Sequence, residues 1–198
     1  MKAVPLTLVL GLFCVAVAAA AEPVEIREGV LFEKNVLIPT DDGAFMMSNV
    51  FRPEAEGRYP VLIAMSIYGK DIHTRDFNPE VWKEMVAHIP GLCESSSCEY
   101  HSWETPDPEV WVPDGYVVVR VDARGSGKSP GKIDPFTPRE IRDLYDAIEW
   151  AGVQPWSNGK VGLAGISYFA MVQWGAAALR PPHLAAIAPW EGAHEAYR

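Results

Sequence analysis

The stretch Lys160-Val161-Gly162-Leu163-Ala164-Gly165-Ile166-Ser167-Tyr168-Phe169-Ala170 decides the fold class of this chain. Up to Ile166 it is a short run of apolar and small residues, which is typical of a strand buried on both faces. From the residue after Ser167 to about Arg180 the pattern predicts a helix. A buried strand that passes directly into a helix is the repeating unit of sheets covered by helices. Gly165 lets the helix approach the strand closely, because glycine has no side chain there.

Buried strands and helices alternate through the rest of the chain. Strands are predicted over residues 31–39, 44–53, 60–66, 116–122, 160–166 and 184–189, and helices over 79–88, from Thr137 to 152, and after Ser167. Thr40-Asp41-Asp42-Gly43 predicts a turn that joins the first two strands into an antiparallel hairpin. This order predicts an α/β fold, with a mostly parallel sheet, helices on both faces and the hairpin at its leading edge.

The helix from Thr137 has the clearest start signal. Thr137-Pro138-Arg139-Glu140 combines an N-cap residue, a proline at the first helical position and a glutamate placed for a capping box. Apolar residues then recur at helical spacing on one face, at Ile141, Leu144, Tyr145 and Ile148. Asn158-Gly159 is expected to form the turn that leads into the strand at residues 160–166.

Composition and charge restrict the class of protein. The 198 residues are 48% hydrophobic and 11% aromatic, which is enough for a buried core and predicts one domain or part of one. The formal net charge is −9, and no cluster of Lys and Arg stands out in the sequence. Because phosphate binding needs such clusters, we expect no nucleic-acid partner.

The first residues are predicted to be a signal peptide. Lys2 provides a positive start, an apolar run extends to Ala21, and Ala19-Ala20-Ala21 is a small-residue cleavage pattern. The run is also long enough for an uncleaved membrane anchor, but its alanine-rich end and Pro5 favour cleavage. We therefore expect residues 1–21 to be removed, residues 22–198 to be secreted or periplasmic, and membrane contact to occur only through the signal peptide.

Two cysteines remain after the predicted signal peptide. Cys93 and Cys98 are five positions apart in a loop rich in Pro and Ser, and a local disulfide is one interpretation in an oxidising compartment. Two unbonded thiols are a second. A metal site with His88 and His101 is a third, but the spacing matches no established zinc pattern, and we expect no metal.

Ser167 also has more than one interpretation. Serine is a frequent N-cap residue of helices, where its hydroxyl accepts a backbone hydrogen bond. A serine between a buried strand and a helix is also the pattern of a nucleophile elbow, which exposes the hydroxyl above the sheet and directs the N-terminus of the helix at a developing oxyanion. The usual motif has glycine two residues after the serine, where this chain has Phe169, so the spacing alone is weak evidence. The strand before Ser167, the helix after it and the small residues around it favour the nucleophile.

The segment from Asp122 to Ser129 superficially resembles a phosphate-binding loop. Its glycines and Lys128 follow a predicted strand, but Asp122 occupies the position of the first required glycine. Pro130 and Gly131 prevent the helix that would have to begin at the lysine. We therefore expect Asp122 and Arg124 to make structural contacts, and we expect no cofactor.

Several motifs between residues 63 and 198 occur together in one family. They are Tyr68-Gly69-Lys70-Asp71, Pro106-Asp107-Pro108, Trp111-Val112-Pro113-Asp114-Gly115-Tyr116, Val121-Asp122-Ala123-Arg124-Gly125-Ser126-Gly127-Lys128-Ser129-Pro130-Gly131, Trp156-Ser157-Asn158-Gly159-Lys160-Val161-Gly162, Gly165-Ile166-Ser167-Tyr168, Ile187-Ala188-Pro189-Trp190-Glu191-Gly192 and Tyr197-Arg198. In combination they resemble the cocaine esterase (CocE/NonD) and X-prolyl dipeptidyl-peptidase family of serine hydrolases. The chain departs from the family pattern at Ala170, where glycine is common, and at His194-Glu195, where Ser or Thr followed by Asp is frequent.

The resemblance implies an α/β-hydrolase fold and an acyl-enzyme mechanism on Ser167. Its substrate is then a small-molecule ester or amide, or a short peptide such as an X-Pro peptide. In such a family the Tyr68 hydroxyl and the Tyr168 backbone N–H donate hydrogen bonds to the oxyanion. The alternative for Tyr68 is a half-buried aromatic residue of a loop.

The rest of a catalytic triad is not recognisable in the sequence. In α/β-hydrolases the acid and then the histidine follow the serine along the chain. The residues after Ser167 contain His183, which we expect to be a capping or surface residue, and His194, which no acid-bearing strand precedes. We expect a C-terminally incomplete hydrolase domain, a fragment that is inactive alone. The alternative is a non-catalytic binding module that retains the hydrolase cleft.

Overall fold

A computed structural model of the chain describes residues 22–195. The predicted signal peptide, residues 1–21, lies outside the described residues. Within them, the strands are β1 (Val24–Arg27), β2 (Val30–Pro39), β3 (Phe45–Pro53), β4 (Tyr59–Ser66), β5 (Val117–Asp122), β6 (Ser157–Ile166) and β7 (Leu184–Trp190). The helices are α1 (Thr74–Phe77), α2 (Pro79–His88), α3 (Pro108–Trp111), α4 (Pro138–Gly152) and α5 (Tyr168–Ala178).

The strands form one sheet in the order β1-β2-β3-β5-β4-β6-β7. The neighbours β5, β4, β6 and β7 are parallel, whereas β1, β2 and β3 pair antiparallel at one side. The predicted antiparallel hairpin and α/β sheet are therefore confirmed, and the sheet is mixed, with three parallel and three antiparallel pairings among the described strands. Because the carboxyl ends of parallel strands meet at one edge, the segments that follow β4, β5, β6 and β7 lie along the same edge of the sheet.

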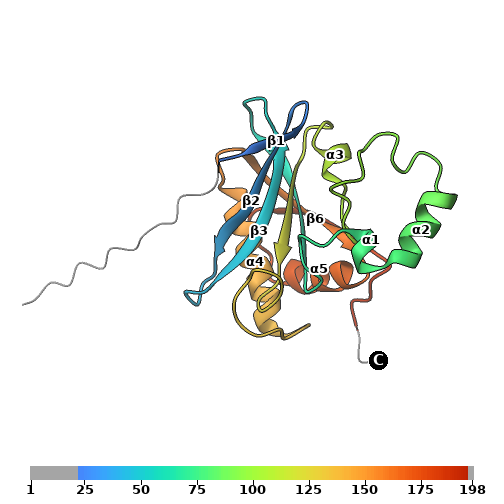
Figure 1. Cartoon of the computed structure of the whole chain (residues 1–198). Coiled ribbons are helices and arrows are strands. Elements are labelled where there is room, and N and C mark those ends of the chain that lie inside the picture. The colour runs from blue at the N-terminus through green and yellow to red at the C-terminus, as the bar shows by residue number, and fades with distance from the viewer. Residues whose placement is uncertain (1–21, 196–198) are drawn as a thin grey trace, which may run out of the picture.

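Helices cover both faces of the sheet, as predicted. Alternate residues of β5, Val117, Val119 and Val121, belong to a buried cluster with residues of α4 and α5 such as Leu144 and Val172. Their neighbours on β5 face the other side. Figure 1 shows α1, α2 and α3 together on that other side, well away from α4.

The second face is covered by one long excursion, residues 67–116, which joins β4 to β5 and contains α1, α2 and α3. Arg120 of β5 fastens it to the sheet, because its guanidinium donates hydrogen bonds to the carbonyls of Tyr100 at 2.6 Å and Pro106 at 2.9 Å. A disulfide joins Cys93 to Cys98 inside the excursion. Helix α2 lies at its periphery, since no residue of that helix is buried.

The sequence interpretation was wrong or incomplete at a few elements. Asn158-Gly159 is not a turn before the strand but part of β6, where it forms an irregularity in the pairing with β4. Strand β1 and the helices α1 and α3 were not predicted. Each of these three is four residues long, which is too short to show a periodic pattern.

The start of α4 differs in one detail from the predicted capping box. Thr137 is the N-cap residue and its hydroxyl accepts a hydrogen bond from the Glu140 N–H at 3.4 Å. In a capping box Glu140 would accept from the N–H of Thr137. Instead its carboxylate accepts from the N–H of Phe136, one residue earlier, at 2.6 Å. The other carboxylate oxygen is therefore free to bind elsewhere.

Over residues 22–195, no helix combines the length and the apolar character that crossing a membrane requires.

Candidate active site

Ser167 lies in a sharp turn between β6 and α5, at the carboxyl edge of the sheet. Its backbone has φ 58° and ψ −115°, a conformation that costs a non-glycine residue about 1–3 kcal/mol. Although Ser167 occupies the N-cap position of α5, its side chain makes no capping hydrogen bond. The fold therefore does not use the hydroxyl as a cap.

The turn is held by backbone hydrogen bonds from both sides. The Ile166 N–H donates to the Glu104 carbonyl of the excursion at 3.2 Å, and the Ser167 N–H donates to the Trp190 carbonyl of β7 at 3.0 Å. Gly165, with φ 147°, has no room for a side chain, since a Cβ atom there would lie 2.4 Å from Cβ of Phe169. The surrounding structure thus imposes the strained conformation of Ser167.

Relief of this strain gives a testable prediction. Ser167→Gly is expected to be more stable than Ser167→Ala by about 1 kcal/mol, because glycine adopts this backbone conformation without strain. The greater conformational freedom of glycine in the unfolded chain offsets only part of this stabilisation. Both variants lack the hydroxyl, so the comparison isolates the backbone. Urea unfolding of the two proteins measures the difference, and a less stable glycine variant would show that Ser167 is not strained.

The first turn of α5 presents the free N–H of Tyr168 beside Ser167. The N–H groups of Ala170 and Met171 both donate to the Ser167 carbonyl at 3.0 Å. The Tyr168 N–H has no hydrogen-bond acceptor among the described residues. Free amides at a helix N-terminus favour negative charge, so this N–H can bind an anionic oxygen.

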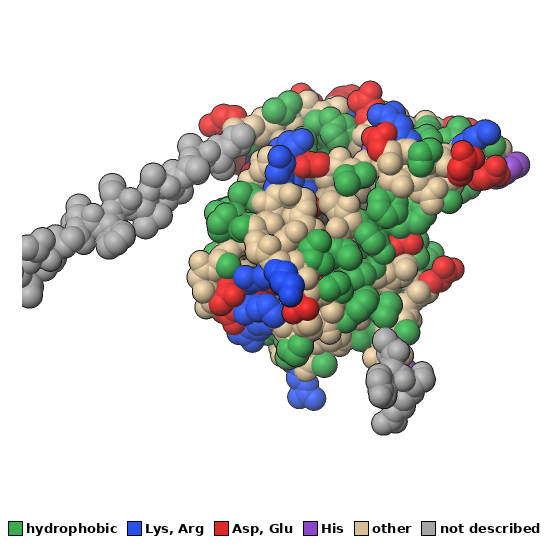
Figure 2. Space-filling model, turned by 60° about the horizontal axis from the view of Figure 1, so that its bottom comes forward, with side chains coloured by type: hydrophobic (Ala, Val, Ile, Leu, Met, Phe, Trp, Pro, Cys, Tyr) green, Lys and Arg blue, Asp and Glu red, His purple; other side chains and the backbone are tan. Residues whose placement is uncertain are grey.

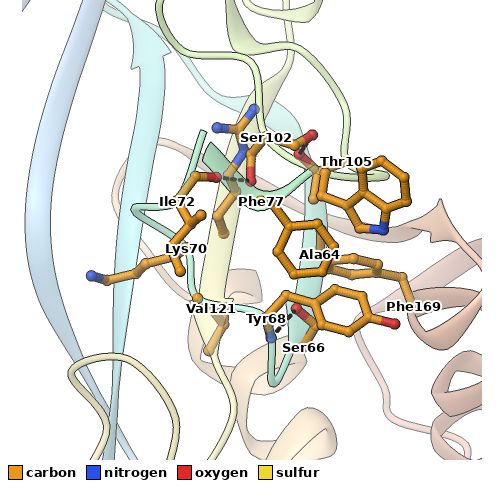
Figure 3. Close-up of a pocket in the computed structure, with 13 residues that line it drawn as sticks. Ala64, Ser66, Tyr68, Lys70, Ile72, Phe77, Ser102, Thr105, Val121 and Phe169 are labelled. Atoms are coloured by element: carbon orange, nitrogen blue, oxygen red, sulfur yellow. Dashed lines mark hydrogen bonds between the residues drawn. The ribbon is translucent and has the colours of Figure 1, made fainter. Parts of the chain in front are cut away.

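Tyr68 follows β4 at the same edge of the sheet. Its ring lies against Tyr168, Phe169 and Phe77, with ring centroids 5.6, 5.8 and 5.2 Å apart. Figure 3 shows the ring directed towards Phe169, whereas the Lys70 side chain extends the opposite way. Burial, together with the negative charge of Glu104, raises the pKa of the Tyr68 phenol. The hydroxyl therefore stays protonated and can donate a hydrogen bond at neutral pH.

A buried carboxylate fixes the loop that carries Tyr68. Asp122 accepts hydrogen bonds from the N–H groups of Lys70 at 2.6 Å and Lys128 at 2.8 Å, and its carboxylate lies 3.4 Å from Nζ of Lys70. The Lys70 ammonium also donates to Asn35 and Asp71, each at 2.9 Å. Asp122 thus joins the loop after β4 to the loop after β5.

Arg124 in the loop after β5 also has a structural role. Its guanidinium donates two parallel hydrogen bonds of 2.8 Å to the Asp143 carboxylate of α4. No helix begins at Lys128, so this loop is not a phosphate-binding loop. Asp122 and Arg124 both make the structural contacts expected from the sequence.

The side chain of Tyr168 has a partner that the sequence did not reveal. Its hydroxyl donates a short hydrogen bond to the Glu140 carboxylate of α4. Burial raises the pKa of Glu140, although its hydrogen bonds from Tyr168 and Phe136 oppose that shift. Burial and the adjacent Glu140 raise the pKa of Tyr168, which keeps the phenol protonated as the donor.

Glu104 is a second residue at the site that the sequence did not single out. Besides accepting from the Ile166 N–H, it has an unusual positive φ of 57°. Burial raises the pKa of its carboxyl, the charge of Glu191 adds to the shift and a hydrogen bond from Trp103 opposes it. Nothing in the local sequence pattern marks this residue.

Neither histidine after Ser167 contacts the serine. His183 precedes β7, at the opposite edge of the sheet from Ser167, and a strand of seven residues is about 20 Å long. It is half-buried and its Nδ1 lies 2.8 Å from Oε2 of Glu149, so it pairs with α4 and is more than the predicted capping or surface residue. The His194 ring lies against Trp174.

The cysteine-bearing loop is not a metal site. His88 pairs with Glu84 at 3.1 Å, and His101 hydrogen-bonds Thr74 at 2.8 Å. Within the part of the chain that the structure describes, no group of three His, Cys, Asp or Glu residues could hold a metal ion. Cys93 and Cys98 are joined to each other.

The surface around Ser167 is largely apolar. Figure 2 looks onto this end of the molecule and shows hydrophobic side chains gathered across the middle of the face. Phe77 contacts Tyr68, Phe136 contacts Tyr168, and Trp190 provides the carbonyl that binds Ser167. All three side chains are exposed, so an apolar group can lie against them.

Residues 42–198 match the sequence pattern of one family, X-Pro dipeptidyl-peptidase (S15 family). The chain is 32% identical over 164 residues to cocaine esterase from Rhodococcus sp. (strain MB1 Bresler), which aligns with 83% of this chain and 24% of that protein. A CocE/NonD family hydrolase from Staphylococcus aureus has a similar structure, with a TM-score of 0.73, 43% identity, and coverage of 85% of this chain and 29% of that one.

More distant structures share the fold alone. An α-amino acid ester hydrolase is 19% identical, with a TM-score of 0.60 and coverage of 91% of this chain and 28% of the other. These likenesses, with the sheet and helices described above, confirm the predicted α/β-hydrolase fold. The chain spans about a quarter of the length of cocaine esterase.

Proposed function

Because this chain belongs to the X-Pro dipeptidyl-peptidase (S15) family, we propose that it carries the nucleophile and the oxyanion hole of a serine hydrolase. The observation that carries the proposal is the setting of Ser167. The residue is strained and its hydroxyl is not a helix cap. The free N–H of Tyr168 lies next to it, and the Tyr68 ring contacts that of Tyr168.

The proposed reaction is acyl transfer. Oγ of Ser167 attacks the carbonyl carbon of the substrate while its proton passes to a general base. The carbonyl oxygen becomes an oxyanion that accepts hydrogen bonds from the Tyr68 hydroxyl and the Tyr168 N–H. The leaving alcohol or amine departs with a proton, and water then releases the acid from Ser167. The proposal places the general base outside residues 22–195, because no described histidine contacts Ser167.

We propose small esters and amides, including short X-Pro peptides, as the substrate class. The names of the family and of cocaine esterase indicate peptide and ester bonds, and the apolar side chains around Ser167 suit an apolar acyl or leaving group. The proposed chemistry needs no cofactor, since an activated serine and two hydrogen-bond donors suffice for acyl transfer.

Labelling with a fluorophosphonate tests the proposal. The complete gene product that carries this chain is expected to form a stoichiometric adduct, located by mass spectrometry on the peptide that contains Ser167. Heat-denatured protein serves as the control, because an unactivated serine does not react. Folded protein without an adduct would contradict the proposal and favour a non-catalytic module that binds ligands in the same cleft.

The Tyr68 hydroxyl gives a second test of the mechanism. Tyr68→Phe is expected to lower kcat by roughly 10²- to 10³-fold, the usual cost of one oxyanion-hole donor, with KM nearly unchanged. The ring contacts with Phe77, Tyr168 and Phe169 remain in this variant, so the fold is preserved. Steady-state kinetics with an aryl ester measure the effect. An unchanged kcat would show that the Tyr68 hydroxyl is not an oxyanion donor and that Tyr68 is a half-buried aromatic residue of the loop.

We further propose that residues 1–21 direct export and are cleaved before Glu22. The Cys93–Cys98 disulfide supports an oxidising compartment, where such bonds persist. N-terminal sequencing of the exported protein tests this proposal, and a mature protein that begins at Met1 would contradict it.

A further inference from the structure

Glu140 is a buried carboxylate that the proposed reaction does not use directly. It lies in the first turn of α4, with 6% of its surface exposed. One oxygen accepts from the Phe136 N–H at 2.6 Å, and the other accepts from the Tyr168 hydroxyl. Tyr168 directly follows Ser167, and the Phe136 ring packs against the Tyr168 ring.

The Tyr168 side chain is buried, with 6% of its surface exposed. Its ring packs against Phe136, with centroids 4.8 Å apart, and against Tyr68, with centroids 5.6 Å apart. Its hydroxyl is fixed by Glu140. The ring of Tyr168 therefore has one orientation, which is set by a carboxylate on α4.

This orientation affects both donors of the proposed oxyanion hole. The Tyr168 backbone N–H is one donor, and it belongs to the residue whose side chain Glu140 holds. The Tyr68 hydroxyl is the other, and its ring lies against the ring that Glu140 holds. A shift of the Tyr168 side chain would displace both donors together.

Packing alone does not call for a carboxylate at this position. A buried carboxylate is costly unless it is well hydrogen-bonded, and an apolar pair of similar volume is often at least as stable. A carboxylate that accepts hydrogen bonds from the Phe136 N–H and the Tyr168 hydroxyl instead fixes direction, which an apolar contact does not.

We propose that Glu140 is a positioning residue for the oxyanion hole: through the Tyr168 hydroxyl it holds the Tyr168 N–H and the Tyr68 phenol in register with Ser167. This inference rests on the proposed function, because it assigns Glu140 a role in the same reaction. Glu140 itself touches no reacting atom.

Tyr168→Phe tests the role, because it removes the hydrogen bond and keeps the ring. The complete gene product is used, and the active sites are first titrated with the fluorophosphonate. The variant is expected to lower kcat per titrated site by roughly 10- to 100-fold, the scale expected for a small misplacement, with KM changed less than twofold. Tyr145→Phe removes the hydroxyl of a tyrosine on α4 whose ring lies against Arg142; it is the matched control and should leave kcat unchanged.

Glu140→Gln provides a second measurement should Tyr168→Phe fold poorly. The amide keeps the volume and can still accept from the Phe136 N–H, but it does not replace both carboxylate contacts. The same loss of kcat per titrated site is expected. The double variant Glu140→Gln with Tyr168→Phe should lower kcat no further than either single variant, since all three lose the same hydrogen bond between Glu140 and Tyr168.

The outcomes separate the two hypotheses. A wild-type protein that reacts with the probe, together with variants whose kcat per titrated site stays within twofold, overturns the positioning role even if the melting temperature falls. Losses of kcat that multiply in the double variant do the same, because they would show that Glu140 and Tyr168 act independently. A folded wild-type protein that does not react with the probe overturns the proposed function, and the positioning role with it.

Discussion

Ser167→Ala is expected to lower turnover by roughly 10⁴- to 10⁶-fold and to leave the folded protein intact. The reaction needs an oxygen that can attack the carbonyl and form an acyl-enzyme, and alanine has none. The expected residual rate comes from the oxyanion donors, which still stabilise the transition state of attack by water. The fold is preserved because the Ser167 hydroxyl makes no capping hydrogen bond.

Hydrolysis of an aryl ester by the complete gene product that carries the variant, with circular dichroism to verify folding, measures this effect. Ser95→Ala is a suitable control, since Ser95 is exposed and its carbonyl accepts from Arg27 at the end of β1 rather than from the turn at Ser167. A turnover within tenfold of wild type would place the nucleophile elsewhere, and the strained turn at Ser167 would then need another explanation.

Asp122→Ala is expected to lower the free energy of unfolding by about 3–5 kcal/mol. The carboxylate is 1% exposed and accepts from two backbone N–H groups, which the variant would leave buried without a partner. The Lys70 side chain has no exposure and would lose one of its two carboxylates. Because Lys70 is two residues after Tyr68, kcat should fall as well.

Denaturant unfolding of the variant measures the loss. Asp122→Asn keeps one acceptor oxygen and should lose less stability than Asp122→Ala. Asp76→Ala removes an exposed carboxylate from α1 and should change stability by less than about 0.5 kcal/mol. If the Asp122 and Asp76 variants were equally stable, the two loops would not depend on the buried carboxylate.

The sequence predicts those elements whose own residues specify them. The valines of β5 and the start signal and apolar face of α4 are local patterns, and both elements form where they were expected. Asp107-Pro108-Glu109 is also a helix start, and it marks α3, although it was interpreted only as a family motif. By contrast, α1 is capped by His73, a residue that seldom signals a helix, and β1 depends on its pairing with β2.

The residues of the candidate site also differ in how far the sequence alone predicts them. Ser167 was predicted as the nucleophile from the contiguous strand, turn and helix around it and from the family resemblance, and that role stays a prediction. Tyr68 and Tyr168 followed from the family resemblance. The link between Glu140 and Tyr168 spans 28 positions, and that between Ile166 and Glu104 joins β6 to a loop inserted far earlier. Such contacts depend on how the elements pack in three dimensions, so no local sequence pattern predicts them.

The backbone bond from Ile166 to Glu104 has a consequence for redesign of this protein. The excursion resembles a removable insertion, yet its Glu104 carbonyl is a support of the turn at Ser167. Deleting the whole excursion would therefore remove a support of the site. Helix α2 has no buried residue, and its Trp82 is the residue whose ring lies against the rest of the excursion, at His73 and His101. New binding segments could therefore replace the part of α2 after Trp82, up to Ile89, without removing the hydrogen bond from Ile166 to Glu104.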